Sequence, residues 1–144
     1  MKRSWTLAVL CLALGAVRAE AQSQNPQLRV FTESGPVVLG SHHPCVALLP
    51  NVALGGSIHF LIGTPGSSTV QFGSTQANVL LADPMLLLSS MAKRNLWYGR
   101  LPVPNDPSLV GLTMQLGLVV VNPSANVILS PLVPFGPIIE DSIQ

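Results

Sequence analysis

Three histidines and one cysteine are the residues whose types and spacing come nearest to a metal site. His42 and His43 are adjacent, Cys45 follows His43 by two residues, and His59 lies further along. A His-x-Cys pair with a third ligand would suit zinc. Adjacent side chains of an extended segment point to opposite sides, however, and no Asp or Glu lies near in sequence. We therefore expect a solvated turn here and no metal site.

Hydrolytic chemistry would need a nucleophile, a base and an orienting acid, and these residue types occur only as scattered single positions. No Gly-x-Ser-x-Gly motif is present. Paired carboxylates would have to come from five acids after residue 21, of which two precede prolines, as turn residues do, and two lie near the C-terminus. These acids are Glu33, Asp83, Asp106, Glu140 and Asp141. The sequence predicts neither an enzyme nor a cofactor.

The Gly-rich run from Gly63 to Ser68 lacks the lysine and the following helix of a phosphate-binding loop. We expect it to be a loop between two strands.

The segment from Arg94 to Arg100 is the best candidate for a binding surface. It holds two adjacent aromatic residues, Trp97 and Tyr98, between two arginines, and aromatic and Arg side chains dominate binding surfaces. Alternation along a strand would send Trp97 and Tyr98 to opposite faces. One of them is expected in the core and the other on the surface. Structural use of both is favoured, and a binding role for the exposed one, which could stack on a sugar or a partner chain, is the alternative.

Residues 1–21 have the three parts of an export signal peptide. Lys2 and Arg3 precede an apolar run at 7–17, and Ala19-Glu20-Ala21 resembles a cleavage site. The apolar run is about half the roughly 20 residues that a membrane-spanning helix needs. We expect cleavage after Ala21, or alternatively after Ala19, and a secreted protein at the cell surface or outside the cell, with the periplasm as an alternative. No membrane span is expected after cleavage.

Removing 21 of the 144 residues leaves 123, which suffices for one domain with a single core. This part carries four cationic residues against five acids, a formal charge of about minus one. Nucleic acids and anionic membranes call for clustered Lys and Arg, so neither partner is expected. The low charge also does little to oppose self-association.

One cysteine remains after residue 21, and a single cysteine cannot form an internal disulfide. The residues after Cys45 are apolar, so we expect a buried free thiol; an intermolecular disulfide is the alternative.

Proline and glycine recur every few residues after position 21, which excludes long helices and is typical of short strands joined by turns. The expected strands are 27–32, 45–49, 57–63, 77–82, 86–90, 96–103, 112–121 and 127–132. Turns are expected at 102–107 and 122–126. In the long strand the even positions Leu112, Met114, Leu116, Leu118 and Val120 form a continuous apolar face, which we expect to be buried in the core. Val119 and Val121 indicate partial cover on the other face.

Two short helical turns are also considered. Asp83 and Pro84 could begin one of them. In this part of the chain, however, two strands joined by a hairpin tip at 93–95 are favoured over a helix. Asp106, Pro107 and Ser108 could begin the other for the same capping reason.

Three stretches of this chain, 101–113, 119–123 and 129–130, together resemble the C-terminal part of small β-sandwich modules of exported bacterial proteins. The family pattern is close to lPxPxdpsLxGxt, then vvxdp, then lS. Weaker landmarks stand at Leu54-Gly55-Gly56 and at 80–84, so the resemblance covers roughly residues 45–133. It implies a β-sandwich without an assigned biochemical activity. This chain differs from the family pattern in three places. Gln115 and Gly117 stand where the family often has Tyr and Gln, and the second cysteine of the family is missing near Asn78. Pro131 follows Ser130, where the family usually has Asn.

These observations predict an all-β chain, a two-sheet antiparallel β-sandwich of immunoglobulin-like or jelly-roll-like type. The expected parts are a signal peptide at 1–21, a flexible lead at 22–26, the domain at 27–136 and a C-terminal tail at 137–144. The expected function is non-catalytic structural or adhesive association at the cell surface or in the extracellular matrix. Partners would be cell-wall polysaccharide or another surface protein. The alternatives are a carbohydrate-binding module that uses Trp97 or Tyr98 and a self-assembling surface subunit.

Overall fold

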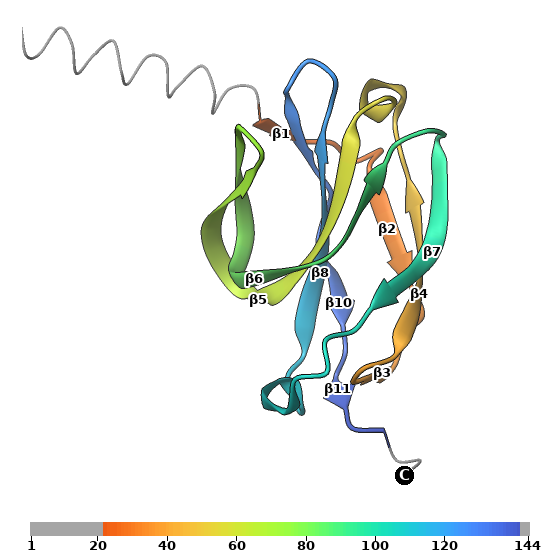
Figure 1. The fold of residues 1–144 in the computed structure, drawn as a ribbon, viewed down its shortest axis with the longest axis vertical. Helices are drawn as coiled ribbons and strands as arrows, with labels where there is room; N and C mark the ends of the chain where they lie inside the picture. Colours follow the sequence, from red (N-terminus) through yellow and green to blue (C-terminus); the bar gives the residue numbers. More distant parts are fainter. Residues whose placement is uncertain (1–21, 142–144) are drawn as a thin grey trace, which may run out of the picture.

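The computed structural model describes residues 22–141, which form an all-β sandwich (Figure 1). The expected signal peptide at 1–21 lies outside these residues. The described elements are strands apart from two short 3₁₀ turns, η1 (Asn51–Ala53) and η2 (Pro107–Leu109). Among the described residues, no helix has the length and apolar character to cross a membrane. The predicted fold class is confirmed.

The larger sheet has the order β1-β9-β8-β5-β6, and β10 also pairs with β8. Its long ladders are antiparallel, whereas the short pair of β1 with β9 is parallel. The strands are β1 (Gln22–Gln24), β5 (Ser57–Phe72), β6 (Thr75–Met91), β8 (Met114–Val121), β9 (Val127–Leu129) and β10 (Val133–Phe135).

The smaller sheet has three antiparallel strands in the order β2-β4-β7. Its strands are β2 (Arg29–Thr32), β4 (His42–Leu48) and β7 (Leu96–Pro102). A separate parallel pair of β3 (Val37–Val38) and β11 (Ile138–Ile139) lies at one end of the molecule, near the C-terminus (Figure 1).

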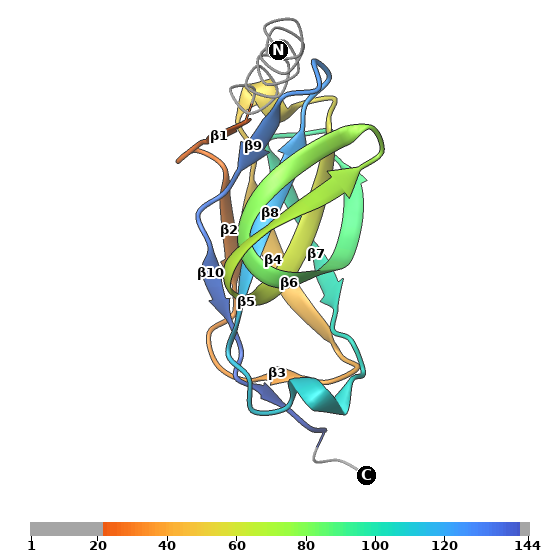
Figure 2. The same cartoon turned by 90° about the vertical axis from the view of Figure 1, so that its left-hand side faces the viewer.

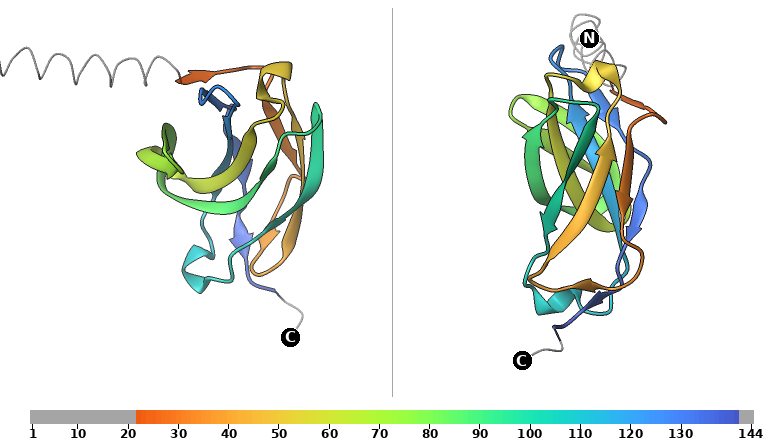
Figure 3. Two further views of the ribbon diagram at one scale, coloured as in Figure 1. Left: turned by 45° about the horizontal axis from the view of Figure 1, so that its top comes forward. Right: turned by 90° about the vertical axis from the view of Figure 1, so that its right-hand side faces the viewer.

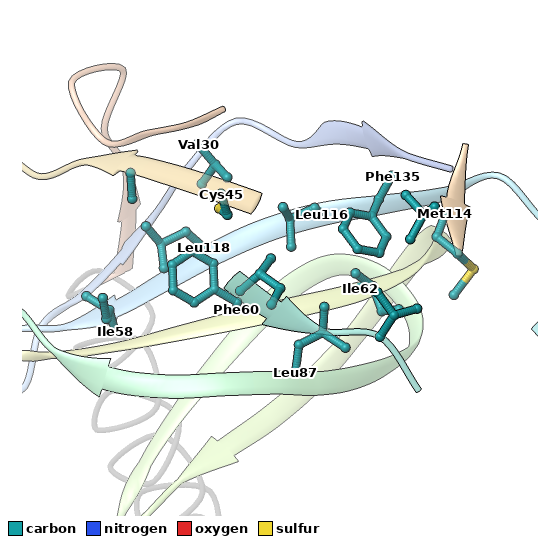
Figure 4. Close-up of a cluster of buried hydrophobic side chains, with 14 of the residues drawn as sticks. Val30, Cys45, Ile58, Phe60, Ile62, Leu87, Met114, Leu116, Leu118 and Phe135 are labelled. Atoms are coloured by element: carbon teal, nitrogen blue, oxygen red, sulfur yellow. The ribbon is translucent and has the colours of Figure 1, made fainter. Parts of the chain in front are cut away.

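The main core lies between the two sheets. Alternate residues of β4 and β2 face it, because Val30, Cys45 and Ala47 are buried while their chain neighbours are exposed. From the larger sheet, Phe60 and Leu116 are fully buried. Figure 4 shows the side chains of Val30, Cys45, Phe60 and Leu116 close together with that of Phe135 in one apolar layer.

The even positions of β8 face this core as predicted, with one exception. Met114, Leu116, Leu118 and Val120 are buried, but Leu112 is 40% exposed, so its predicted burial was wrong. The strand begins only at Met114. Leu112 follows the turn at Val110 and Gly111, where Gly111 has a φ of 85°. Its backbone is hydrogen-bonded to that of Leu109 and Ile138.

The hairpin of β5 and β6 curls back over the opposite face of the larger sheet (Figure 2). β5 pairs with β8 only over Ser57 to Gly63, and the rest pairs with β6 alone. A second apolar cluster fills the space beneath the curl. Its buried members are Leu61, Ala77, Val79, Leu81, Val119 and Val127. The predicted cover over Val119 is therefore supplied by the hairpin.

The curl corrects two expectations about this hairpin. The run from Gly63 to Ser68, predicted as a loop, lies within β5. The strands expected at 77–82 and 86–90 are parts of one continuous strand, β6. Register shifts near Ile62 and Pro65 bend the ladder and keep it paired. The glycines permit the close approach, because a Cβ on Gly63 would lie 2.8 Å from the carbonyl oxygen of Ala82. The helical alternative at Asp83 does not occur.

The predicted hairpin tip at 93–95 was also wrong. β6 belongs to the larger sheet and β7 to the smaller one, so the segment crosses between sheets. Asn95 anchors the crossing, since its Nδ2 donates to the carbonyl of Leu49 and to Oδ1 of Asn51.

Two predicted turns are confirmed. The Asp106 side chain accepts a hydrogen bond from the Ser108 N–H and begins η2. Between β8 and β9, Asn122 Oδ1 accepts from the N–H groups of Ser124 and Asn126. Ala125 has a φ of 63° in that turn.

Residues from the predicted lead and from the predicted tail pair with strands of the domain. Within the lead at 22–26, Gln22–Gln24 form β1, and the Gln22 amide both donates to and accepts from the backbone of Asn78. Within the tail at 137–144, Ile138 pairs with Val37 and is fully buried. These edge pairings were not predicted, because residues 22–24 are polar and residues 138–139 lie near the C-terminus.

Replacing Leu116 by Ala should lower the free energy of unfolding by about 2 to 5 kcal/mol, because it opens a cavity in the main core. Leu112→Ala is the matched control on the same segment and should cost less than about 1 kcal/mol. Chemical denaturation measures both. Similar losses in the two variants would contradict the observed register.

Candidate functional site

The structure places Trp97 and Tyr98 on opposite faces of β7, as alternation predicted. Trp97 is half-buried and packs against Phe60, with ring centroids 4.6 Å apart. Its ring lies over Gly99, where a Cβ would come within 2.8 Å of the indole. Tyr98 is 77% exposed. Trp97 therefore packs against the core, and Tyr98 is the aromatic residue of this segment that stands on the outer face.

Tyr98 belongs to a larger surface, which we call the outer face of the three-stranded sheet (Figure 3, right). The strand registers set its exposed side chains in rows across β2, β4 and β7. One row is Phe31, Val46 and Tyr98; the next is Arg29, Leu48 and Leu96; Pro44 and Arg100 lie opposite each other beyond Tyr98.

Large apolar groups of this face are open to solvent. Phe31 is 47% exposed and Leu96 49%, and Val46 and Leu48 are each more than one-third exposed. A contiguous apolar patch of this kind on a sheet face is a typical mark of a binding surface. Arg29 adds to it, because its guanidinium carbon lies 5.8 Å from the centre of the Phe31 ring, within the range of a cation–π contact.

The outer face is shallow. A depression of about 520 Å³ is lined by residues of all three strands, including Phe31, Val46, Tyr98 and Arg100, with Glu33 at its margin. A second hollow of about 340 Å³ adjoins it, where Lys93 and Arg94 of the crossing segment meet Leu96 and Tyr98. The shape suits an extended ligand that lies along the sheet more than a small molecule enclosed in a cleft.

Sequence reasoning identified Arg94, Trp97, Tyr98 and Arg100 but missed Phe31, Val46 and Leu48. Both faces of β2 and β4 are rich in apolar residues, so their sequences do not show which face is covered. The structure brings Tyr98 and Arg100 onto one surface with Arg94 at its border and removes Trp97 from it.

The histidines do not come together. His42 is exposed, while His43 is buried, with Nε2 3.3 Å from the Glu33 carbonyl oxygen and its ring edge-on to Phe135. His59 lies on β5 in the other sheet. Within the described part of the chain, no three His, Cys, Asp or Glu side chains are grouped as metal ligands.

His59 forms a Ser–His arrangement that the sequence did not reveal. Its Nδ1 lies 2.7 Å from the Ser89 hydroxyl and its Nε2 2.9 Å from the Ser57 hydroxyl. Burial lowers the pKa of His59, which favours the neutral imidazole. Phe72, from the far end of the hairpin, stacks on the ring at a centroid distance of 4.2 Å. This group ties the curled hairpin to its own base, and both ring nitrogens are engaged by hydroxyls.

Cys45 is buried in the main core, with 2% of its surface exposed, and is a free thiol. Burial raises the pKa of this thiol to about 12. The group is therefore protonated at neutral pH and points away from the outer face.

An apolar cavity of about 60 Å³ lies between the curled hairpin and the larger sheet. Its lining includes Leu61, Val79, Leu81, Gly117 and Leu132. It belongs to the second apolar cluster and is small beside the cavity of about 150 Å³ that holds benzene in an engineered protein core.

The chain was compared with protein-family models, curated proteins and solved structures. No protein-family model and no curated protein matches the chain. Among solved structures, a DUF4466 family protein from Parabacteroides merdae is similar at 13% sequence identity and a TM-score of 0.38. The match covers 76% of this chain and 42% of the other, so this chain spans less than half the length of that protein.

A chain that begins at Gln22 contains Cys45 as its single cysteine. We expect it to react slowly with iodoacetamide at pH 8 when folded and rapidly when unfolded, because the buried thiol is protonated. Mass spectrometry of the alkylated fraction over time measures this. Rapid native alkylation, or a dimer band that Cys45→Ser abolishes on non-reducing electrophoresis, would show an accessible thiol instead.

Trp97→Ala should lower the free energy of unfolding by about 2 to 4 kcal/mol, since it removes a ring packed on Phe60. Tyr98→Ala should change it by less than about 1 kcal/mol, because the side chain is largely solvated. Thermal unfolding of the two variants makes the comparison. A larger loss for Tyr98→Ala than for Trp97→Ala would reverse the assignment of the two faces.

Proposed function

We propose that this chain is a non-catalytic, exported binding module that acts in structural or adhesive association at the cell surface or in the extracellular matrix. Its ligand surface is the outer face of the three-stranded sheet. The observation that carries this proposal is the row of Phe31, Val46 and Tyr98, exposed side by side across three strands. Solvation of two large aromatic rings in one row is costly unless a partner covers them.

The arrangement of the carboxylates supports a non-catalytic role. Glu33 follows β2, Asp83 lies at a register shift within β6, and Asp106 caps η2. The Asp106 carboxylate accepts two hydrogen bonds from Ser108, which lower its pKa and explain its position as a turn residue. These three acids therefore lie in three different parts of the fold.

Polysaccharide is favoured over a globular protein partner by the shape and chemistry of the outer face. Sugars present apolar C–H faces to aromatic rings and hydroxyls to Arg side chains, and Tyr98 and Arg100 follow each other on one face of β7. The depression is open along the sheet, which accommodates a chain of sugars. Of the two aromatic residues proposed from sequence, Tyr98 stands on the outer face, whereas Trp97 packs on Phe60 and only borders the adjoining hollow. Phe31 supplies the second ring of the outer face.

Tyr98→Ala and Phe31→Ala should each weaken retention on insoluble cell-envelope material by about 1 to 2 kcal/mol, because each removes an aromatic contact. Leu86→Ala is the matched control: Leu86 is 54% exposed but lies on β6, away from the outer face. The measurement is the bound fraction in a pull-down at several protein concentrations.

The thermal midpoint of each variant must stay near that of the parent chain for the comparison to report binding. Unchanged retention in both aromatic variants would contradict the proposed surface. Weaker retention in Leu86→Ala would move the binding surface to β6. A concentration-dependent increase in mass, abolished by Tyr98→Ala, would favour self-assembly through the same face.

A further inference from the structure

The cationic side chains of the described residues gather on one side of the molecule. Residues 22–141 contain three arginines and one lysine. Arg29 and Arg100 stand on the outer face of the three-stranded sheet, and Lys93 and Arg94 line the adjoining hollow. From this placement we infer that the ligand of the outer face is an acidic polysaccharide, an inference that rests on the proposed binding function.

The two sheet arginines frame the aromatic row. Arg29 is in the row of Leu48 and Arg100 is opposite Pro44, so the two rows are four residues apart along β4, or about 13 Å at the usual rise of a strand. Phe31, Val46 and Tyr98 lie between them. A polymer crossing this face would meet a guanidinium group before and after the aromatic contacts.

These cations are available to a ligand. The side chains of Lys93, Arg94 and Arg100 are all exposed, and those of Lys93 and Arg94 line one hollow. Arginine binds carboxylates through paired N–H groups, which gives both charge and orientation. In a chain with few charges, four cations on one side attract an anionic polymer.

Most of the acids lie away from the outer face of the three-stranded sheet. Asp83 lies on the hairpin of the larger sheet, Asp106 caps η2, and Glu140 and Asp141 follow β11 at the end of the molecule. Glu33 alone among the described acids borders the depression that holds Arg100. The net charge of about minus one does not reveal that the cations and the acids lie in different parts of the molecule.

Three features favour an acidic polysaccharide over nucleic acid or an acidic protein. Four cations are few for a polyphosphate, whose binding is dominated by many Lys and Arg contacts. The exposed aromatic surface suits the C–H faces of sugar rings. The shallow depression runs across strands and offers no deep pocket for a side chain of a partner protein.

The test measures retention on immobilised polygalacturonate, alginate and hyaluronate, each beside its methyl-esterified form. Esterification keeps the sugar chain and removes the carboxylate charge. We expect retention on at least one acidic polymer, a loss of about fivefold or more on its ester, and a decrease as salt rises from 50 to 300 mM, concentrations chosen to shorten the screening length to about 6 Å.

Charge variants separate local charge from net charge. Arg100→Gln and Arg94→Gln should each weaken retention by about two- to fivefold, and Glu33→Gln should strengthen it by about twofold, as single exposed charges do. Gln76→Glu and Asp83→Asn are the matched controls, since they change the net charge by the same amounts on the hairpin. Both controls should leave retention unchanged.

Equal retention on an acidic polymer and its ester, still lost in Tyr98→Ala, would overturn the acidic ligand and leave the proposed binding surface standing. Tyr98-independent retention on the acidic polymers would contradict the surface itself. No retention on any of the three acidic polymers would also overturn the inference, as would stronger retention on polyglutamate or single-stranded DNA. Effects of Gln76→Glu as large as those of Arg100→Gln would show binding by net charge alone.

Discussion

The burial of β8 on both faces is the constraint on which the rest of this structure depends. Leu116, Leu118, Val119 and Val120 are all almost fully buried although successive residues face opposite sides of the sheet. Such a strand needs two covering layers. The three-stranded sheet supplies one, and the curled hairpin of β5 and β6 supplies the other, held to its base by the contact of Phe72 with His59. The length of the hairpin and its close-packed glycines follow from this requirement.

The covering role of the three-stranded sheet also defines the surface available for function. Its inner face is fixed by the core through Cys45, Ala47 and Trp97. Its outer face does not pack against the core. A sheet that served only to cover the core would be expected to present polar side chains on that face. The outer face presents Phe31, Val46 and Tyr98 instead, with the cations of the described chain around them. The combination of apolar exposure and charge separation is the physical basis of the proposed function.

Much of this fold could be predicted from the sequence because two-residue alternation and turn residues report directly on strands. They identified the face of β8 that meets the core, the turns at Asp106 and Asn122, and the opposite orientations of Trp97 and Tyr98. They failed where strand pairing is decided by distant partners. Glycine and proline at 63–68 look like a loop but permit a bent strand, and Lys93 to Asn95 look like a hairpin tip but cross between sheets. The same limit applies to the site, since Phe31 and Val46 join Tyr98 only through pairings of β2 and β7 with β4.

The central claim is that a sugar polymer binds across the outer face of the three-stranded sheet. The most direct measurement is a titration of the ¹⁵N-labelled protein with a short oligogalacturonide, followed through backbone amide shifts. The account predicts saturable shifts confined to β2, β4, β7 and the segment before β7, including the amides of Phe31, Val46 and Tyr98. Shifts centred on the curled hairpin or its apolar cavity, with none on β4 and β7, would contradict it.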